Sequence, residues 1–326
     1  MTSIPNQPVE VRTKGVGQRA GQRAIERTLE FGLVLCGAVS ILTTFSIIAI
    51  LLEETRRFFT MPDVTPGEFL GTLRWSPLLG SEKHFGIWPL IVGTGLVSGV
   101  AALLALPLGL ITAVFLSEYA PRRLRTVLKP VLEVLAGIPT VVYGYFALTV
   151  LTPALKWLLG DQNVESYNAL SAGLAVGIMI FPIVCSLSED ALRAVPRSLR
   201  EGAYACGASK FDVSVKVVVP AALSGVIASY LLAIARATGE TMIVALAAGN
   251  LAPDLSTLEG WKQGFNPLHQ TQTMTGYMVQ IFLGDTASLG VEYYSSYAVA
   301  FVLFLLTMGL TLLGHYTNKK FREVYE

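Results

Sequence analysis

Charge is the scarcest property of this 326-residue sequence: Asp, Glu, Lys and Arg make up 14% of the residues, whereas hydrophobic residues make up 52%. Soluble domains carry about 25% charged residues, so the shortage argues against a soluble enzyme. The high hydrophobic content excludes a disordered or collagen-like chain. The formal net charge of +1, from 24 basic and 23 acidic residues, gives no support to nucleic-acid binding.

Residues that build metal sites, disulfide frameworks and catalytic centres are also scarce. The three cysteines and three histidines lie far apart, at Cys36, Cys185, Cys206, His84, His269 and His315. Their spacing predicts neither a disulfide framework nor a metal site. The sequence lacks the HExxH motif of zinc proteases, the GxSxG motif of serine hydrolases and the GxxxxGK[S/T] phosphate-binding loop. We therefore expect no cofactor on this chain, and any ATP that drives it would bind another subunit.

Long uncharged stretches are what the sequence has in place of such motifs. Six runs of 19 to 34 residues contain no Asp, Glu, Lys or Arg: Phe31–Leu52, His84–Ser117, Val134–Leu155, Ser166–Ser188, Val217–Ala235 and Tyr293–Asn318. Because about 20 helical residues cross the ~30 Å hydrocarbon core of a bilayer, each run predicts a membrane-spanning helix. The fifth helix is expected to extend over roughly Ala221–Gly249, with two charged residues inside it.

A seventh uncharged run, Gln263–Gly284, is rich in amide and hydroxyl side chains and predicts a surface or interfacial helix. The fold prediction is therefore all-α, with six transmembrane helices in residues 29–318 and cytoplasmic tails at 1–28, expected to be disordered, and 319–326. Seventeen Lys and Arg residues lie in the two tails and in the second and fourth loops, against six in the other three loops. Because basic residues are enriched on the cytoplasmic side, both termini are expected in the cytoplasm.

The fourth loop, Ser188–Pro220, has the pattern of an ordered element. Pro196 suits the first turn of a helix, apolar residues recur at helical spacing over Leu199–Cys206, and Gly207 is placed to end the helix. A second amphipathic stretch follows. Such a helix either lies on the membrane surface or inserts into the groove of a partner protein, and the pattern alone leaves both alternatives open.

The same loop resembles the EAA loop of ABC importer permeases, whose pattern is E-A-A-x3-G-x9-I-x-L-P. The resemblance is carried by Glu201-Gly202-Ala203, Gly207 and Val217-Val218-Val219-Pro220. Gly202 replaces the usual Ala and costs the local helix up to about 1 kcal/mol. The resemblance implies a coupling helix that docks on a separate ATPase subunit, which would bind the ATP and Mg²⁺. The implied coupling residues are Arg200, Glu201, Ala203, Gly207 and Pro220.

Four further segments resemble the PstC-type permeases of high-affinity phosphate importers: Phe85–Thr94, Phe115–Pro121, Glu133–Gly144 and Arg236–Met242. This resemblance implies the type I ABC importer (MetI-like) permease fold, in a bacterial inner membrane, with inorganic phosphate as the substrate. It also implies a PstA-like second permease, a PstB-like ATPase dimer and a periplasmic PstS-like phosphate-binding protein as partners.

Alternative functions stay open at this point. The substrate could be another oxyanion, such as phosphonate or molybdate, although the segment Arg236–Met242 favours phosphate. The chain could also be an ungated channel, or a signalling subunit that reports phosphate status without transporting it. The coupling loop argues against a channel, because a channel needs no ATPase.

Two charged residues inside the fifth predicted span are the main candidates for a substrate path. Arg236 and Glu240 are four residues apart and would share a helix face, and Arg236 lies about 24 Å along a helix from Pro220, near mid-membrane. A lone charge there costs about 2.5–3.5 kcal/mol, so each needs compensation. Either the two form a structural ion pair, or Arg236 meets the anion and Glu240 positions it. A guanidinium suits phosphate because it donates two hydrogen bonds and stays charged.

Hydroxyl groups near these charges extend the candidate path. Thr238 and Thr241 belong to the same segment, and the third predicted span carries Thr140 and Tyr143 beside Pro139. Proline interrupts backbone hydrogen bonding and can leave polar groups facing a cavity, although a simple kink is the alternative. We expect these four hydroxyl side chains to line the path together with the two charged residues.

Overall fold

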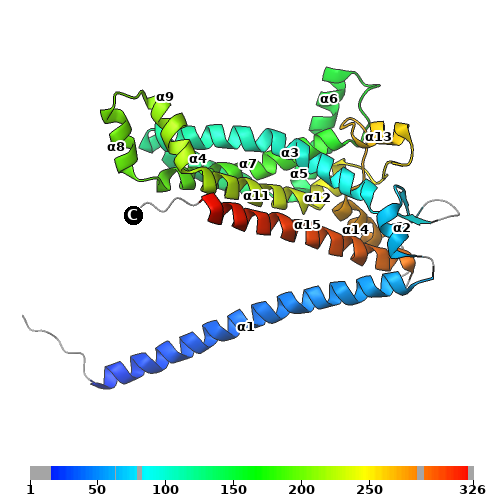
Figure 1. Ribbon diagram of the computed structural model, residues 1–326, viewed down its shortest axis with the longest axis horizontal. Helices are drawn as coiled ribbons and strands as arrows, with labels where there is room; N and C mark the ends of the chain where they lie inside the picture. Colours follow the sequence, from blue (N-terminus) through cyan, green and yellow to red (C-terminus); the bar gives the residue numbers. More distant parts are fainter. Residues whose placement is uncertain (1–15, 63, 79–82, 285–289, 322–326) are drawn as a thin grey trace, which may run out of the picture. The chain divides into compact units, whose positions relative to one another are not determined.

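The computed structural model describes residues 16–62, 64–78, 83–284 and 290–321, with side chains described between 26 and 317. The chain divides into two compact units, one up to Glu53 and one from Glu54 onward. Within the described ranges the structure is mostly helical, which confirms the predicted class (Figure 1). The strands there form one short antiparallel hairpin, β1 (Trp75–Ser76) with β2 (His84–Phe85).

The first long helix, α1, covers Val16–Thr60 and includes a stretch apolar enough to span a membrane. It begins within the segment that was expected to be a disordered tail, so residues 16–28 differ from the prediction. The Gln, Arg, Ala and Glu residues of that segment are good helix formers, which explains the earlier start. Residues 1–15 of the expected tail and 322–326 at the other end lie outside the described residues.

Three further long apolar helices lie in the second unit: α3 (Trp88–Val114), α7 (Ala169–Ala194) and α15 (Val291–Phe321). A π-helical turn, η1 (Phe115–Tyr119), extends α3. The third predicted span is assembled from α5 (Thr140–Phe146), the π-helical turn η2 (Ala147–Leu151) and α6 (Thr152–Leu159). Within the described residues, five helices could cross a membrane, or six if a bent pair forms one span.

The predicted fifth span, roughly Ala221–Gly249, shares only its first part with that bent pair. The earlier half of the pair consists of α9 (Lys210–Asp212), η3 (Val213–Val218) and α10 (Val219–Ala221), which lie mostly in the predicted fourth loop, and it meets α11 (Leu223–Thr238) at an angle of 69°. The prediction of one continuous helix to Gly249 is wrong, because α11 ends at Thr238 and α12 covers only Met242–Ala247. The carbonyl of Glu240, freed by the break, accepts a hydrogen bond of 2.6 Å from Thr275 Oγ1.

The seventh uncharged run also differs from its prediction. It contributes to two helices, α13 (Leu258–Gly264) and α14 (Met274–Leu283), and α14 packs against α12 and α15 instead of lying on the surface. Met274, Tyr277 and Ile281 are fully buried. Several polar residues of the run are buried as well, namely Thr271, Gln272, Thr273 and Thr275. The N–H of Met274 donates to Thr94 Oγ1 at 3.0 Å.

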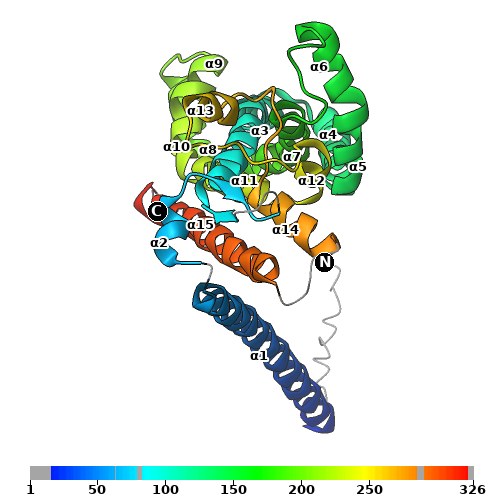
Figure 2. The ribbon, with the colours of Figure 1, turned by 90° about the vertical axis from the view of Figure 1, so that its right-hand side faces the viewer.

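Helices α3 and α7 pack together along much of their length and form the centre of the second unit (Figure 2). Glycine allows the close approach: a Cβ atom on Gly173 would lie 2.6 Å from Val100 Cβ, and one on Gly177 would lie 2.9 Å from Leu104 Cδ2. Helix α11 packs on α7 and α15, and α12 packs on α5. These contacts place the break between α11 and α12 beside the central pair.

The second unit has two ends that matter for function (Figure 1). Helix α8 (Arg197–Ala205) and α9 lie at one end, which we call the α8 end, near the start of α4 (Arg122–Ala136). Helix α2 (Pro66–Gly71) and α13 lie at the opposite end, which we call the α13 end.

Candidate functional site

The helix of the fourth loop forms where the sequence predicted it. Pro196 immediately precedes α8, and Gly207 ends the turn after it with φ of +82°. Glycine adopts this left-handed conformation without the steric cost that a Cβ atom would bring. None of the residues of α8 is buried, so the helix offers most of its surface to another molecule.

The five expected coupling residues do not share one orientation. Glu201 is exposed on α8, and Pro220 is exposed on α10. Ala203 is half-buried against the hydrophobic cluster beneath the helix. Arg200 turns inward, where its guanidinium donates to Glu118 Oε1 at 3.0 Å and to the carbonyls of Val195 and Leu192 at 2.6 and 2.8 Å.

A buried carboxylate that the sequence analysis missed lies at the same end of the unit. Glu189, on α7, is 1% exposed and has three cations around it. Lys129 Nζ lies 3.1 Å from Glu189 Oε2, while Arg125 Nε and Arg193 Nη1 lie 3.4 and 3.6 Å from Oε1. A hydrogen bond to Asp190 raises the pKa of Lys129; burial opposes this, and Glu189 adds to the rise. The basic residues of α4 were visible in the sequence, but Glu189, the carboxylate that Lys129 contacts, lies 60 residues away.

The two charges of the fifth span form an ion pair. Arg236 Nη1 donates to Glu240 Oε2 at 2.9 Å, with the Arg236 side chain 45% exposed and the Glu240 side chain 2% exposed. Among the described residues, this is the one hydrogen bond that the guanidinium makes. Glu240 therefore holds one edge of Arg236, and the other N–H donors remain available on the surface of the unit.

The four expected hydroxyl side chains are engaged with backbone carbonyls or lie near the break. Thr238 Oγ1 donates to Ile234 O at 2.8 Å, and Thr241 Oγ1 donates to Gly239 O at 3.3 Å. Tyr143 is buried and donates to Leu135 O at 2.8 Å, which ties α5 to the end of α4. Thr140, at the start of α5, is half-buried.

Close packing brings the third and fifth spans together at the site. A Cβ atom on Gly144 of α5 would lie 3.2 Å from Ile243 Cα and 3.2 Å from Met242 O, both on α12. The backbones of α5 and α12 therefore touch directly beside the break. The structure thus unites Arg236, Glu240 and Thr241 at the break, with α5 next to it.

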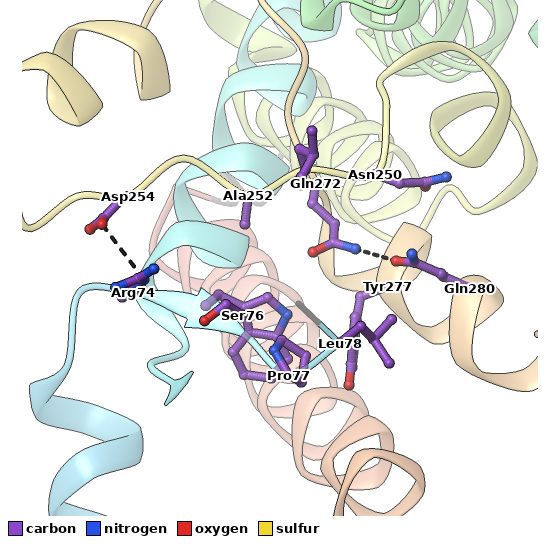
Figure 3. Close-up of a pocket in the computed structure, with 12 residues that line it drawn as sticks. Arg74, Ser76, Pro77, Leu78, Asn250, Ala252, Asp254, Gln272, Tyr277 and Gln280 are labelled. Atoms are coloured by element: carbon purple, nitrogen blue, oxygen red, sulfur yellow. Dashed lines mark hydrogen bonds and ion pairs between the residues drawn. The ribbon is translucent and has the colours of Figure 1, made fainter. Parts of the chain in front are cut away.

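A pocket of about 520 Å³ opens at the α13 end of the unit (Figure 3). Arg74 and Asp254 lie on one side of it, with Arg74 Nε 3.7 Å from the Asp254 carboxylate, and Gln272 donates to Gln280 at 2.6 Å on another side. Burial opposes the ionisation of Asp254, but hydrogen bonds from Ser256 outweigh it and lower the pKa of that carboxyl. The sequence analysis missed this pocket because three distant segments form it.

Comparison with known proteins agrees with this architecture. Residues 105–323 match the family described as "Binding-protein-dependent transport system inner membrane component". The chain is 33% identical over 287 residues to the probable ABC transporter permease protein YqgH of Bacillus subtilis, covering 87% of this chain and 88% of that protein. It is also 33% identical over 266 residues to the phosphate transport system permease protein PstC of Mesorhizobium japonicum, covering 76% and 77%.

Solved structures show the same fold at low sequence identity. A bacterial ABC transporter involved in alginate import matches with a TM-score of 0.63 at 12% identity, covering 94% of this chain and 100% of that one. The inward-facing MetNI methionine ABC transporter matches with a TM-score of 0.55 at 17% identity, covering 73% and 98%. These likenesses confirm the predicted type I ABC importer permease fold. The chain is a multi-pass membrane protein that belongs to the family of inner-membrane components of binding-protein-dependent transport systems.

Proposed function

We propose that this chain is the permease subunit of an ATP-driven importer that moves inorganic phosphate through the inner membrane into the cytoplasm. The permease relatives named for phosphate transport support the substrate, and the family supports the mode of transport. The observation that carries the proposal is Arg236, whose half-exposed guanidinium lies beside a broken membrane helix and keeps N–H donors available.

The pairing of Arg236 with Glu240 suits a path more than a high-affinity site. A buried carboxylate fixes the guanidinium and offsets its charge, so that a passing anion meets directed donors without a large net positive charge. Conduction requires binding that is favourable enough for entry and weak enough for release. Discontinuous membrane helices commonly form such sites in transporters, and the break after Thr238 provides one here.

The two ends of the second unit suit the proposed partners. Exposed α8 would dock on a PstB-like ATPase dimer, which binds ATP and Mg²⁺, so the α8 end would face the cytoplasm. The distribution of basic residues predicts both termini on that same side of the membrane. The α13 end, with its pocket, would then face the periplasm and a PstS-like binding protein. A PstA-like permease would cover the membrane face that carries Arg236 and supply the other half of the path.

Replacement of Arg236 by Gln tests this proposal. Because Gln retains polarity but loses the charge and the forked donors, we expect phosphate uptake to fall roughly 10- to 100-fold, equivalent to about 1.5–3 kcal/mol for hydrogen bonds to a charged group. The measurement is radiolabelled phosphate uptake by cells that lack the chromosomal copy and carry either variant at equal membrane levels. Arg123→Gln is the control, since Arg123 is exposed on α4 and remote in sequence from the break.

Normal uptake by Arg236→Gln would remove Arg236 from the path. Unchanged phosphate uptake in cells lacking the chain would instead refute phosphate as the substrate, and labelled molybdate and phosphonate would then be tested in the same cells. Loss of phosphate-dependent gene control without loss of uptake would favour the signalling alternative.

A further inference from the structure

We propose that Arg200 is a positioning residue inside the coupling loop, and that it ties α8 to the ends of two membrane helices instead of contacting the ATPase. This inference rests on the proposed function, because it assigns a role within the coupling of ATP hydrolysis to transport. It concerns the residue immediately before Glu201, whose own side chain is exposed.

The first observation is the number and placement of the acceptors around Arg200. Its guanidinium reaches the carbonyls of Leu192 and Val195, at the carboxyl end of α7, and the carboxylate of Glu118 in η1. The last carbonyls of a helix lack partners within that helix, and a cation there also interacts favourably with the helix dipole. Arg200 thus caps α7 while it pairs with the extension of α3.

The second observation is that Glu118 depends on Arg200. The Glu118 side chain is 7% exposed, and it has Arg200 Nη2 and Ser117 Oγ as donors at 3.0 Å each. A carboxylate this buried needs a cation, because an unpaired buried charge is strongly unfavourable. The pair therefore stays together when α8 or η1 moves.

The third observation is that α8 has no other polar attachment. Among the described residues, Arg200 is the one member of α8 whose side chain forms a hydrogen bond or an ion pair. The remaining attachment is apolar, through the half-buried side chains of Leu199 and Ala203. Apolar contacts oppose the separation of α8 from the membrane helices, but they restrain its sliding along them only weakly, because the hydrophobic effect is not directional. Arg200 therefore determines how α8 is oriented on the membrane helices.

The fourth observation is that a second helix, α4, also binds η1. Arg125 of α4 donates to the carbonyls of Leu116 and Ser117, and its Nε lies 3.4 Å from Glu189 of α7. Arg200 of α8 and Arg125 of α4 therefore bind the same π-helical turn, and each also contacts a residue at the carboxyl end of α7. A displacement of α8 is transmitted through Arg200 to α3, α7 and α4 together.

The decisive experiment uses Glu118→Gln in the complete transporter reconstituted in liposomes, with phosphate imported and ATP hydrolysed measured together. Glu118 lies off α8, so its replacement weakens the Arg200 attachment without altering any α8 residue. We expect ATP hydrolysis to stay within twofold of wild type while import falls at least tenfold, so that ATP consumed per phosphate rises at least fivefold. Arg200→Gln should behave alike, and Arg200→Lys should fall between it and wild type, because an ammonium group cannot reach three divergent acceptors.

A double-mutant cycle distinguishes positioning from a general loss of structure. The double variant Glu118→Gln with Arg200→Gln should raise the ratio of ATP to phosphate no further than Arg200→Gln alone, because both changes remove the same ion pair, while Arg123→Gln keeps the wild-type ratio. A wild-type ratio of ATP to phosphate in Glu118→Gln overturns the proposal. The proposal is also overturned if the ATPase fails to co-purify with Arg200→Gln while Glu118→Gln keeps normal coupling. That result would mean that Arg200 contacts the ATPase. Failure of the wild-type complex to import phosphate would refute the proposed function instead.

Discussion

Glu189 and Glu240 are almost equally buried, at 1% and 2% exposure, yet their surroundings differ. Glu189 has three cations from two helices, at 3.1 to 3.6 Å, and two of these also bind other groups. Glu240 has one cation, Arg236, whose side chain is half exposed and has one partner among the described residues.

The difference distinguishes a structural role for Glu189 from the role in the substrate path that we propose for Glu240. A cluster in which Glu189, Lys129 and Arg125 each have several partners fixes the relative position of α4 and α7. A carboxylate that binds one edge of a single guanidinium leaves the other edge for a ligand. Burial alone would have ranked the two carboxylates together, and the number of their partners distinguishes them.

The largest expected effect on stability is that of Glu189→Gln, which is compared with the same substitution at Glu240. Glu189→Gln leaves three cations without their shared anion. We expect the free energy of unfolding to fall by about 3 kcal/mol, the lower end of the 3–5 kcal/mol typical for breaking a buried pair. The partial exposure of those cations places the value at that lower end. Thermal unfolding of the purified protein in detergent measures the change.

Glu240→Gln is the matched comparison. It removes one charge-assisted hydrogen bond to a half-exposed partner, for which we expect a loss of about 1.5 kcal/mol in stability but a stronger loss of phosphate uptake than Glu189→Gln gives at equal membrane levels. Equal ratios of uptake loss to stability loss at the two positions would contradict the distinction.

A substitution beside the break that changes no charged residue probes the scaffold of the Arg236 site. Gly144→Val adds a Cβ atom that would lie 2.9 Å from Leu246 Cδ1 and 3.2 Å from the backbone of α12. Overpacking of this kind costs about 1–3 kcal/mol, and here it pushes α12 away from α5. We expect reduced uptake together with a lower unfolding temperature.

The matched control for that experiment is Gly95→Val, because a Cβ atom on Gly95 meets no atom within 4 Å. A Gly144→Val protein with normal uptake and stability would show that α5 and α12 separate freely, and would remove α5 from the candidate path.

The smallest effect is expected at the exposed ion pair of the α13 end. The pKa of Asp254 is lowered in the folded protein, so its contribution to stability is present above the unfolded value of about 3.9 and is lost as the pH falls through the lower folded value. Asp254→Asn should therefore be slightly less stable than wild type at pH 6 and should lose less stability below pH 4. An identical change in unfolding free energy from pH 6 to pH 3 in Asp254→Asn and in wild type would contradict a lowered pKa of Asp254 in the folded protein.

Much of the fold was predictable because the bilayer imposes a length on each uncharged run. Each of the six runs is largely helical in the structure, and the helix of the fourth loop begins after Pro196 as expected. The break after Thr238 was not predictable from local sequence, because the donor that stabilises it, Thr275, lies 35 residues away. The burial of α14 was missed for a similar reason, since its first turn donates to distant acceptors, Met274 N–H to Thr94 of α3 and Thr275 Oγ1 to the carbonyl of Glu240 in the break.

Within the candidate site, the contact between Arg236 and Glu240 was predictable from the sequence, but the surroundings of the other candidate residues were not. The spacing of Arg236 and Glu240 indicated that they would meet, and they do, although Glu240 lies beyond the end of the helix. The inward orientation of Arg200 could not be read from its loop, because its carboxylate partner is 82 residues away. The hydroxyl groups of Thr238 and Tyr143 suggested a polar lining, whereas each donates to a nearby backbone carbonyl.

The hydrogen bond from Thr275 to the Glu240 carbonyl has a consequence for how the protein is made. Glu240 leaves the ribosome 35 residues ahead of its donor, a delay of roughly 2–7 s at 5–20 residues per second. During that interval α11 and α12 enter the membrane with the break's carbonyl lacking this partner, in a medium that provides no water to replace it. The break is therefore completed late in biosynthesis, when α14 arrives, and a ribosome that stalls between these two points leaves a membrane protein whose candidate path is not yet formed.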